Sequence, residues 1–385
     1  MGNKNVSMRS IKFQVLIFVC LAFIVTNALA VEPKAPKISA KSYILLDFNS
    51  GKVIAELNST SRVEPASLTK MMSSYVIDNE LKAGNIRLTD EVKISKKAWK
   101  MPGSRMFVEV NSKVTVEKLV KGIIIQSGND ATVAMAEFIA GSEDSFVSLM
   151  NEYARKLNMN STHFVNSTGL PHEDHFTTAE DLSKLVTAII HDFPEHYAWY
   201  SEKVFTYNSI KQFNRNKLLW QDKYVDGVKT GHTESAGYCL ASSAIKDGMR
   251  LISVVLGTNS KQARATESQK LLTFGFRFYE THRLYEADAK LTSAQVWKGD
   301  AIRFDLGLKE DLWVTIPRGE YKTLKATMSL DAKIIAPVKK GEVFGTVNVD
   351  LAGKPFLVRD LASLNDVGEG SFMSGLIDEV KMLLE

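Results

Sequence analysis

Ser67 and Lys70 are the first residues in this 385-residue chain whose types and spacing could do chemistry. They open a stretch, Ser67 to Leu81, that is rich in helix-compatible residues, so we expect both on one face of a helix. Lys70 could then take the hydroxyl proton of Ser67, while the positive helix terminus would favour negative charge on that oxygen. A serine needs such a base before it can attack a carbonyl carbon. The pair therefore predicts a nucleophilic serine.

Two further motifs follow along the chain. Ser127 and Asn129 flank a glycine in a polar break just before a predicted helix. Lys229-Thr230-Gly231 occurs once and directly precedes His232 and a predicted strand, where a glycine lets a substrate backbone approach a sheet edge closely. Each motif alone is weak evidence. Their order, and their places on a helix start, a loop and a strand edge, indicate one catalytic site.

Both serine motifs have a competing copy. Ser243-Ala244-Ile245-Lys246 repeats the serine and lysine spacing, but it lies in a predicted β-hairpin, and we interpret it as structural. Ser363-Leu364-Asn365 repeats the second motif in the linker before the C-terminal tail.

The three motifs together resemble those of serine β-lactamases and penicillin-binding proteins. Longer segments are similar to the low-molecular-mass penicillin-binding proteins that act as D-alanyl-D-alanine carboxypeptidases, namely Glu64–Met72, Gln126–Ala131, Asn166–Pro171 and Lys229–Thr233. The resemblance covers nearly the whole mature chain. It implies an α+β (or α/β) catalytic domain of the β-lactamase/transpeptidase-like fold, an antiparallel sheet flanked by helices with a helical subdomain. A small all-β domain and an amphipathic C-terminal helix would follow.

The resemblance also implies a catalytic sequence. Ser67 would attack the D-alanyl-D-alanine carbonyl with Lys70 as the base, the terminal D-alanine would leave, and water would hydrolyse the acyl-enzyme. The backbone N–H groups of Ser67 and His232 would form the oxyanion hole. Ser127 would pass a proton to the leaving amine. Penicillins would acylate Ser67 and inhibit the enzyme.

Substrate binding is implied for residues around these groups. Asn129 would hold the substrate amide, and Lys229 would add positive potential that helps to keep Lys70 neutral. Thr230 and Arg264 match the family's positions for the substrate carboxylate, although the neighbours of Arg264 depart from the usual pattern. Gly231 and His232 complete the predicted substrate-binding strand. We expect no cofactor and no metal ion.

The element pattern predicts where these residues are held. Strands at 42–47 and 52–56, and at 237–244 and 249–256, read as hairpins, whereas residues 92–193 have mostly helical spacing. A helix at 265–276 precedes short alternating segments at 281–362, and the apolar residues at 369–385 are spaced as in an amphipathic helix. We therefore predict a catalytic domain at 31–278, a β domain at 279–366 and a C-terminal helix at 367–385.

Residues 1–30 read as a signal peptide, with an apolar run from Phe13 to Val25 that ends before Ala28-Leu29-Ala30. Cys20 would leave with it, so the mature chain would keep Cys239 alone and form no intrachain disulfide. Loss of the three cations of residues 1–30 lowers the formal charge from +4 to +1, which argues against nucleic-acid binding. We expect a periplasmic protein attached peripherally to the inner membrane by its C-terminal helix.

Several alternatives remain at this point. A β-lactamase of the same fold would need an acidic residue that activates the deacylating water, as in the Glu-x-x-Leu-Asn loop of class A enzymes. This loop is not found in the sequence. Glu173 is the acidic candidate, and we interpret it as part of a loop rather than as the residue that activates water. A D,D-endopeptidase would cleave the same kind of bond, after a D-alanine carbonyl. His172 and His175 superficially suggest a zinc pair, but their spacing misses the His-Glu-x-x-His pattern. A non-catalytic wall-binding protein is the fourth reading, and the tail could instead cap the β domain or form a dimer contact.

Overall fold

The computed structural model describes residues 33–384, so the predicted signal peptide and Cys20 lie outside the described residues. A five-stranded sheet has the order β2-β1-β9-β8-β7, and each neighbouring pair is antiparallel. Its strands are β1 Ser42–Asp47, β2 Val53–Leu57, β7 Val225–Thr233, β8 Gly237–Lys246 and β9 Met249–Thr258. Both predicted hairpins are therefore present, and β7 lies at an edge of the sheet.

The turn between β8 and β9 explains why the second hairpin could be predicted. Asp247 and Gly248 both have positive φ, 51° and 81°. A two-residue turn of this type matches the right-handed twist of the flanking strands, and aspartate followed by glycine tolerates it best. Ser243, the serine of the competing motif, is buried on β8 and accepts a hydrogen bond from Arg250 Nη1 at 2.6 Å, so its role is structural.

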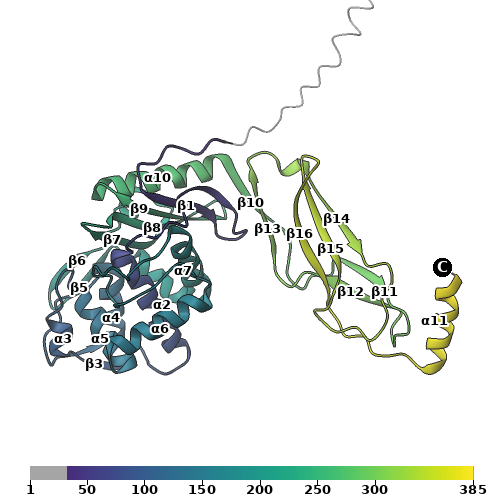
Figure 1. Cartoon of the computed structure of the whole chain (residues 1–385), viewed down its shortest axis with the longest axis horizontal. Coiled ribbons are helices and arrows are strands. Elements are labelled where there is room, and N and C mark those ends of the chain that lie inside the picture. The colour runs from purple at the N-terminus through teal and green to yellow at the C-terminus, as the bar shows by residue number, and fades with distance from the viewer. Residues whose placement is uncertain (1–32, 385) are drawn as a thin grey trace, which may run out of the picture. The chain divides into compact units, whose positions relative to one another are not determined.

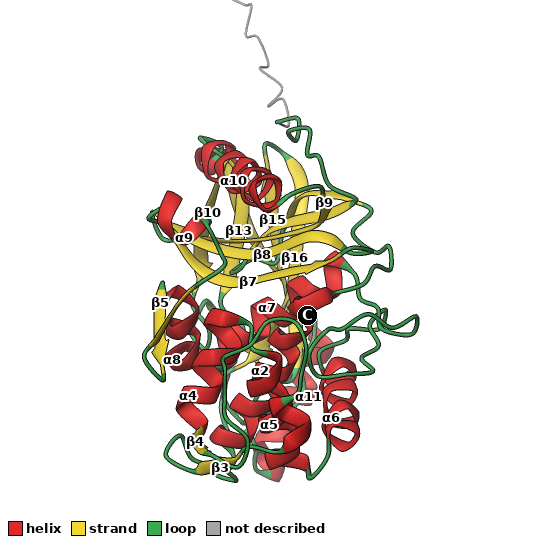
Figure 2. Ribbon diagram, turned by 90° about the vertical axis from the view of Figure 1, so that its left-hand side faces the viewer, coloured by secondary structure: helices red, strands yellow, loops and turns green. Residues whose placement is uncertain are grey.

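Helices cover both faces of this sheet (Figures 1 and 2). The helix α10, Lys261–Phe278, lies on one face, and α2, Thr69–Lys82, and α7, Ala179–Asp192, lie on the other. α10 begins four residues before the predicted start because the Ser260 side chain caps it, accepting the Ala263 N–H at 3.0 Å.

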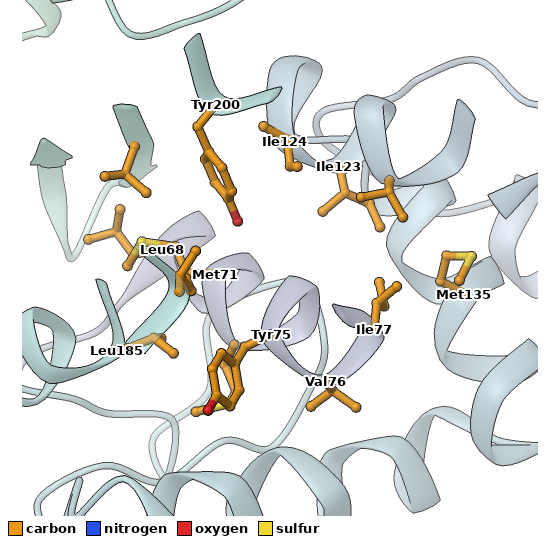
Figure 3. Close-up of a cluster of buried hydrophobic side chains, with 14 of the residues drawn as sticks. Leu68, Met71, Tyr75, Val76, Ile77, Ile123, Ile124, Met135, Leu185 and Tyr200 are labelled. Atoms are coloured by element: carbon orange, nitrogen blue, oxygen red, sulfur yellow. The ribbon is translucent and has the colours of Figure 1, made fainter. Parts of the chain in front are cut away.

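The helical subdomain predicted between residues 92 and 193 is present. It contains α3 Lys96–Trp99, α4 Val116–Lys121, the π-helical turn η2 Gly122–Gln126, α5 Asn129–Ala140 and α6 Glu143–Lys156, with the short strands β3 Glu91–Lys93 and β4 Lys113–Thr115. Its core surrounds α2, where Met71, Val76 and Ile77 are fully buried against side chains such as Ile123 (Figure 3). Buried packing on several sides fixes α2, the helix that carries Lys70.

A connecting region that sequence periodicity did not resolve follows α7. It consists of α8 Pro194–Tyr197, the 3-10 turn η3 Ala198–Ser201, the hairpin β5 Val204–Tyr207 and β6 Ile210–Phe213, and α9 Leu218–Gln221. Each of these elements is four residues long. Such short segments give too few repeats for a period to be recognised.

The remainder of the chain is β structure, as predicted, followed by a helix. β10 Tyr279–Tyr285 pairs with β13 Leu312–Pro317, and a second five-stranded sheet has the order β11-β12-β16-β15-β14. Its strands are β11 Thr292–Gln295, β12 Arg303–Gly307, β14 Leu324–Leu330, β15 Val343–Leu351 and β16 Lys354–Ser363, with the 3-10 turn η4 Tyr321–Thr323 before β14. A separate apolar core that includes Phe304, Leu306 and Val347 fills it.

The last described helix is α11, Phe372–Leu384, which begins five residues after the start predicted for the C-terminal helix, residue 367. Ser363, of the second competing motif, is the last residue of β16 rather than part of a linker, and its hydroxyl donates to the Asn365 carbonyl at 2.6 Å. Among residues 33–384, no helix is long and apolar enough to cross a bilayer.

Candidate active site

Ser67 lies in a 3-10 turn, η1 Ala66–Leu68, that leads directly into α2. Leu68 is fully buried, and it anchors the turn in the core, whereas Ser67 is only partly buried. The ammonium nitrogen of Lys70 lies 3.3 Å from Ser67 Oγ. The predicted pair therefore meets, although the serine precedes the first α-helical residue instead of belonging to α2.

The other contact of Lys70 is with a loop that sequence reasoning quoted but did not place in the site. Lys70 Nζ donates to the Thr168 carbonyl at 2.5 Å. Asn166 Oδ1 accepts the backbone N–H groups of Thr168, Gly169 and Leu170, at 3.1, 2.7 and 3.2 Å, and so fixes the shape of the loop. Lys70 is thus held between the nucleophile and a rigid carbonyl.

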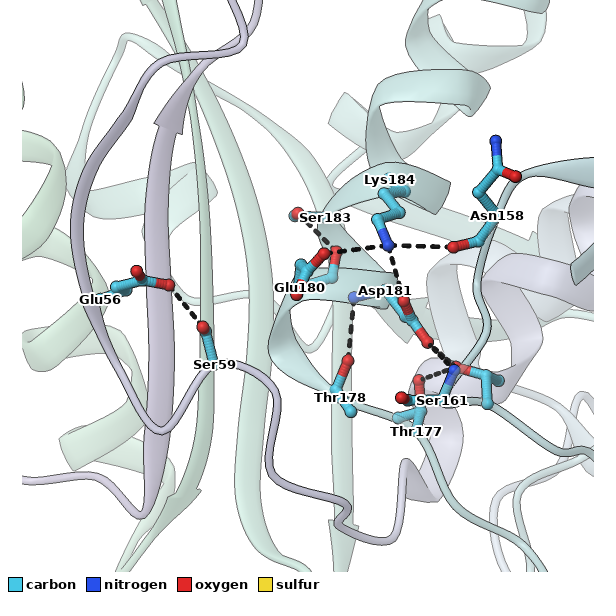
Figure 4. Close-up of polar contacts among 11 residues, drawn as sticks. Glu56, Ser59, Asn158, Ser161, Thr177, Thr178, Glu180, Asp181, Ser183 and Lys184 are labelled. Atoms are coloured by element: carbon cyan, nitrogen blue, oxygen red, sulfur yellow. Dashed lines mark hydrogen bonds and ion pairs between the residues drawn. The ribbon is translucent and has the colours of Figure 1, made fainter.

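The same loop is anchored through the start of α7 (Figure 4). Asp181 Oδ2 accepts the Ser161 N–H at 2.9 Å, and the Thr178 side chain caps the helix by accepting the Asp181 N–H at 3.0 Å. Lys184 binds the other oxygen of Asp181 at 3.0 Å. These contacts join both ends of the segment that carries Thr168 to one helix.

Lys70 is 1% exposed, and burial is the main reason why its pKa is lowered from 10.5 to about 7. The positive charge of Arg215 lowers this pKa further, whereas the negative charge of Asp130 opposes the shift. Near neutral pH, a large fraction of Lys70 is therefore an uncharged amine. An uncharged amine beside a serine hydroxyl can accept its proton.

Ser127 has an unusual backbone and an unusual environment. It follows the π-helical turn η2 with φ of 65°, a conformation that residues other than glycine rarely adopt. Its hydroxyl is buried and has no hydrogen-bond partner among the described residues. An unpaired buried hydroxyl is uncommon in a folded protein and is typical of a group whose hydrogen-bond partner is the substrate.

Asn129 and Asp130 open α5 and hold a neighbouring loop. Asn129 Nδ2 donates to the Pro102 carbonyl at 2.6 Å. Asp130, fully buried, accepts the N–H groups of Met106 and Phe107, each at 2.8 Å, and of Val108 at 3.2 Å. The sequence analysis identified Asn129 as a site residue but not Asp130. The position of Asp130 in the first turn of a predicted helix could have indicated a role in holding neighbouring backbone N–H groups.

Lys229, Thr230 and Gly231 lie together on the edge strand β7, as predicted. Burial, together with the charges of Lys70 and Arg215, lowers the pKa of Lys229 well below its usual value. A Cβ added to Gly231 would lie 3.1 Å from the Pro65 carbonyl oxygen. The glycine thus lets the strand approach the turn that carries the nucleophile, a reason that the sequence did not reveal.

His232 and Arg264 flank this end of the strand. His232 is exposed and stacks on Tyr238 with ring centroids 3.9 Å apart. Arg264, on α10, is 6% exposed, and its Nη1 donates to the Gly231 carbonyl at 2.9 Å. One arm of this guanidinium therefore supports the strand.

Six of the predicted residues line a pocket of about 670 Å³, whereas Lys70, Asn129 and Lys229 are not part of its lining. The pocket is lined by Ser67, Gly103, Ser104, Ser127, Phe213, Asn214, Arg215, Lys217, Thr230, Gly231, His232, Lys261 and Arg264. Four of these side chains are cations, and none is a carboxylate. A pocket with this lining favours an anionic ligand.

The rival features lie apart from this pocket. His175 is buried, its Nδ1 accepts the Val165 N–H at 3.2 Å, and its Nε2 lies 2.8 Å from Thr69 Oγ1. His172 and Glu173 are exposed. Within residues 33–384, no group of three or more His, Cys, Asp and Glu side chains is arranged to hold a metal ion. Cys239 is buried and unbridged.

Comparisons with known proteins agree with this arrangement. The D-alanyl-D-alanine carboxypeptidase family matches residues 29–260, and the penicillin-binding protein 5 C-terminal domain matches residues 279–369. The D-alanyl-D-alanine carboxypeptidases DacA and DacC of Escherichia coli K12 are 46% and 48% identical over 378 and 357 residues. These alignments cover 94% of both chains for DacA, and 91% of this chain and 89% of the relative for DacC.

Solved structures share the fold as well. Penicillin binding protein 5 from Haemophilus influenzae superposes with a TM-score of 0.85 at 44% identity, covering 88% of this chain and 100% of that one. Penicillin binding protein 6B from Escherichia coli gives a TM-score of 0.74 at 35% identity, covering 86% and 97%. The predicted transpeptidase-like fold with a C-terminal all-β part is confirmed.

Proposed function

Since the chain belongs to the D-alanyl-D-alanine carboxypeptidase family of penicillin-binding proteins, we propose that Ser67 is the nucleophile with which it removes the terminal D-alanine from peptidoglycan peptides. The chain is a serine-type D-Ala-D-Ala carboxypeptidase that binds β-lactams. One observation carries the assignment of the nucleophile. The buried Lys70 amine, with its pKa near 7, lies 3.3 Å from the Ser67 hydroxyl.

Acylation begins with a proton transfer. The proton of Ser67 Oγ moves to Lys70 Nζ while the oxygen forms a bond with the carbonyl carbon that precedes the terminal D-alanine. Negative charge develops on the carbonyl oxygen, and the backbone N–H groups of Ser67 and His232 stabilise it. Each such donor lowers the barrier by about 3 to 4 kcal/mol in comparable acyl-transfer sites.

Breakdown of the tetrahedral adduct needs a proton on the leaving nitrogen. Ser127 supplies it, since its buried hydroxyl has no partner of its own among the described residues, and it recovers a proton from the Lys70 side of the site. The C–N bond breaks, D-alanine leaves, and the acyl group stays on Ser67. Water then attacks the ester, with the same groups acting in reverse order.

Substrate binding uses the residues around the nucleophile. Asn129 holds the amide of the peptide, and Thr230 and Arg264 bind the terminal carboxylate together with the backbone at Gly231 and His232. Lys229 is buried, and burial together with the charge of Lys70 lowers its pKa. Because repulsion between two cations is mutual, a charged Lys229 would oppose protonation of Lys70.

β-Lactams follow the same first step but not the second. The β-lactam carbonyl acylates Ser67, and release of the product requires an activated water. No carboxylate lines the pocket, and Glu173 is exposed, so we expect slow deacylation rather than β-lactamase turnover.

Membrane attachment through α11 is part of the proposal, with export to the periplasm and peripheral attachment to the inner membrane. Phe372, Met373 and Val380 on this helix are 83%, 66% and 56% exposed. On the opposite side, Asp378 accepts the Lys298 N–H at 2.8 Å. A helix that packs through its polar side and exposes its apolar side suits a lipid surface. Deletion of residues 371–385 should release the protein from membranes and leave peptide hydrolysis intact; unchanged fractionation would contradict the attachment.

D-Alanine release tests the nucleophile. Wild-type protein should release D-alanine from an N-acylated peptide ending in D-Ala-D-Ala, and Ser67→Ala should not. Ser243→Ala, in the competing motif, serves as the matched control and should keep the activity. Release by Ser67→Ala, or loss of release on addition of a chelator, would overturn the proposal.

A further inference from the structure

Ser167, the residue before Thr168, is fully buried, and all three of its polar groups are hydrogen-bonded. Its N–H group and its Oγ both donate to Glu143 Oε1, at 3.2 and 2.8 Å. Ser73 Oγ donates to the Ser167 carbonyl at 2.6 Å. Because Thr168 follows Ser167 directly, these bonds determine where the Thr168 carbonyl meets Lys70.

The supports of Ser167 come from two helices that pack against each other, α2 and α6. Ser73 lies three residues after Lys70 on α2, so the two side chains share a helix face and bind successive carbonyls of one segment. Glu143 is the first residue of α6. It is therefore the support that fixes this segment from outside the helix that carries Lys70.

Glu143 is a buried carboxylate, 8% exposed, with both oxygens in use. Its Oε2 pairs with Lys97 Nζ at 2.8 Å, while Oε1 accepts from Ser167. Burial opposes ionisation of this carboxyl, but the hydrogen bonds from Lys97 and Ser167 outweigh burial and lower its pKa. A charged acceptor makes stronger hydrogen bonds than a neutral one. The grip on Ser167 is thus of the strong kind.

Glu143 stands apart from the reacting groups. It is not part of the pocket lining, and the charges that shift the pKa of Lys70 are those of Arg215 and Asp130. Any influence of Glu143 on the reaction must therefore pass through the segment that it holds.

We propose that Glu143 is a positioning residue for the catalytic lysine, because through Ser167 it holds the Thr168 carbonyl where that carbonyl accepts the hydrogen bond of Lys70. This inference rests on the proposed function and adds a residue that the motifs do not contain. Without an acceptor at position 143, the Ser167 N–H and hydroxyl lose their partner, and the segment moves. Lys70 then loses the carbonyl that keeps its amine beside Ser67 Oγ, and misplacement of such a group by about 1 Å costs about 100-fold in rate.

The test is the pH profile of acylation by benzylpenicillin in Glu143→Met, which removes the acceptor and keeps a side chain of similar length. The second-order rate constant of acylation should fall by roughly 10- to 100-fold. The midpoint of the profile should move to lower pH by about half a unit or more, because a carbonyl acceptor stabilises the ammonium form of Lys70. Arg215 and Asp130 are unchanged in this variant, so their effects on the midpoint stay the same.

Three further variants separate positioning from general stability. Glu143→Gln keeps an oxygen for Ser167 and should recover most of the rate. Lys97→Met is the matched control, because it removes the ion pair and leaves the bonds to Ser167; its rate should stay within about threefold of the wild type. Ser167→Ala loses one of the two bonds to Glu143 and should move the midpoint in the same direction by a smaller amount.

A folded Glu143→Met protein with the wild-type rate, or with a lower rate and an unmoved midpoint, would overturn the inference. An equal loss in Lys97→Met would overturn it as well, since the ion pair would then be the cause. If Glu143→Met does not fold, Ser167→Ala decides, and an unmoved midpoint there has the same meaning. A wild-type protein that benzylpenicillin does not acylate would instead overturn the proposed function, so the two failures can be told apart.

Discussion

Substitution of Gly169 by alanine should uncouple the nucleophile from the loop that orients Lys70. Gly169 has φ of 83°, and a Cβ at this position would overlap the carbonyl oxygen of Ala66 and lie 2.8 Å from Thr69 Oγ1. Both of these neighbours belong to rigid elements, the turn that carries Ser67 and the first residue of α2. The new methyl group can be accommodated only if the loop and the turn separate.

The size of the effect follows from two contributions. A left-handed conformation costs an alanine about 1 to 2 kcal/mol, and the overlap adds about 1 to 3 kcal/mol, as in other overpacked sites. Real Cβ atoms essentially never lie closer than 3.0 Å to such neighbours, so the backbone must shift by roughly 1 Å. A displacement of that size in a catalytic site lowers a rate by about 100-fold.

Gly141→Ala is the matched control. Gly141 ends α5 with φ of 75°, and an added Cβ there would meet nothing within 4 Å. It should lose only the conformational part, about 1 to 2 kcal/mol of unfolding free energy, and keep the wild-type acylation rate. Urea denaturation gives the stabilities, and stopped-flow acylation with a fluorescent penicillin gives the rates. A folded Gly169→Ala protein that acylates at the wild-type rate would refute the argument.

Three further predictions concern charged and titrating groups. The second-order rate of acylation by benzylpenicillin should fall about tenfold for each pH unit below 7, because protonated Lys70 cannot accept the serine proton, and level off above it; a flat profile from pH 5 to 8 would contradict this assignment. Asp130→Asn should move the midpoint of that profile to lower pH, because the Asp130 carboxylate raises the pKa of Lys70; an unmoved midpoint would contradict this effect. The same substitution should lower the free energy of unfolding by about 2 to 4 kcal/mol, because the hydrogen bonds that the charged carboxylate accepts from the Met106 and Phe107 N–H groups are lost. Burial lowers the pKa of His175 from 6.5 to about 4, so the stability that it contributes is complete above pH 6.5 and is lost as the pH falls toward 4, by about 3 kcal/mol in all. Urea titrations at pH 7 and 4.5 should show this loss, and His175→Gln should reduce it; identical pH dependence in both proteins would argue against it.

Much of the fold could be predicted because local patterns agree with the final packing. The hairpin at Asp247 and Gly248 has a turn sequence that permits positive φ, and the start of α7 has a threonine cap. The short hairpin of β5 and β6 was not predicted, since four-residue strands carry almost no periodic signal. The 3-10 turn at Ser67 was likewise predicted to be the start of the helix, because a 3-10 turn and an α-helix both bring residues that are three positions apart onto the same side.

The site could be predicted only in part. Ser67, Lys70, Ser127 and Lys229 belong to short motifs, and spacing along the chain is enough to suggest them. Arg215 belongs to no motif, and it enters the pocket because the surrounding loop is pinned by hydrogen bonds to Glu202 and Gly227, which no local pattern reveals. The Thr168 carbonyl is a backbone group, so its role depends on loop shape and not on residue type.

The measurement that tests the central claim most directly is the intact mass of the protein after exposure to benzylpenicillin. Wild-type protein should gain one stable adduct, located on the peptide that contains Ser67, and Ser67→Ala should gain none. Ser243→Ala should form the same adduct as the wild type, since that serine is buried in β8. An adduct on Ser67→Ala, or none on the wild type, would contradict the assignment of Ser67 as the nucleophile.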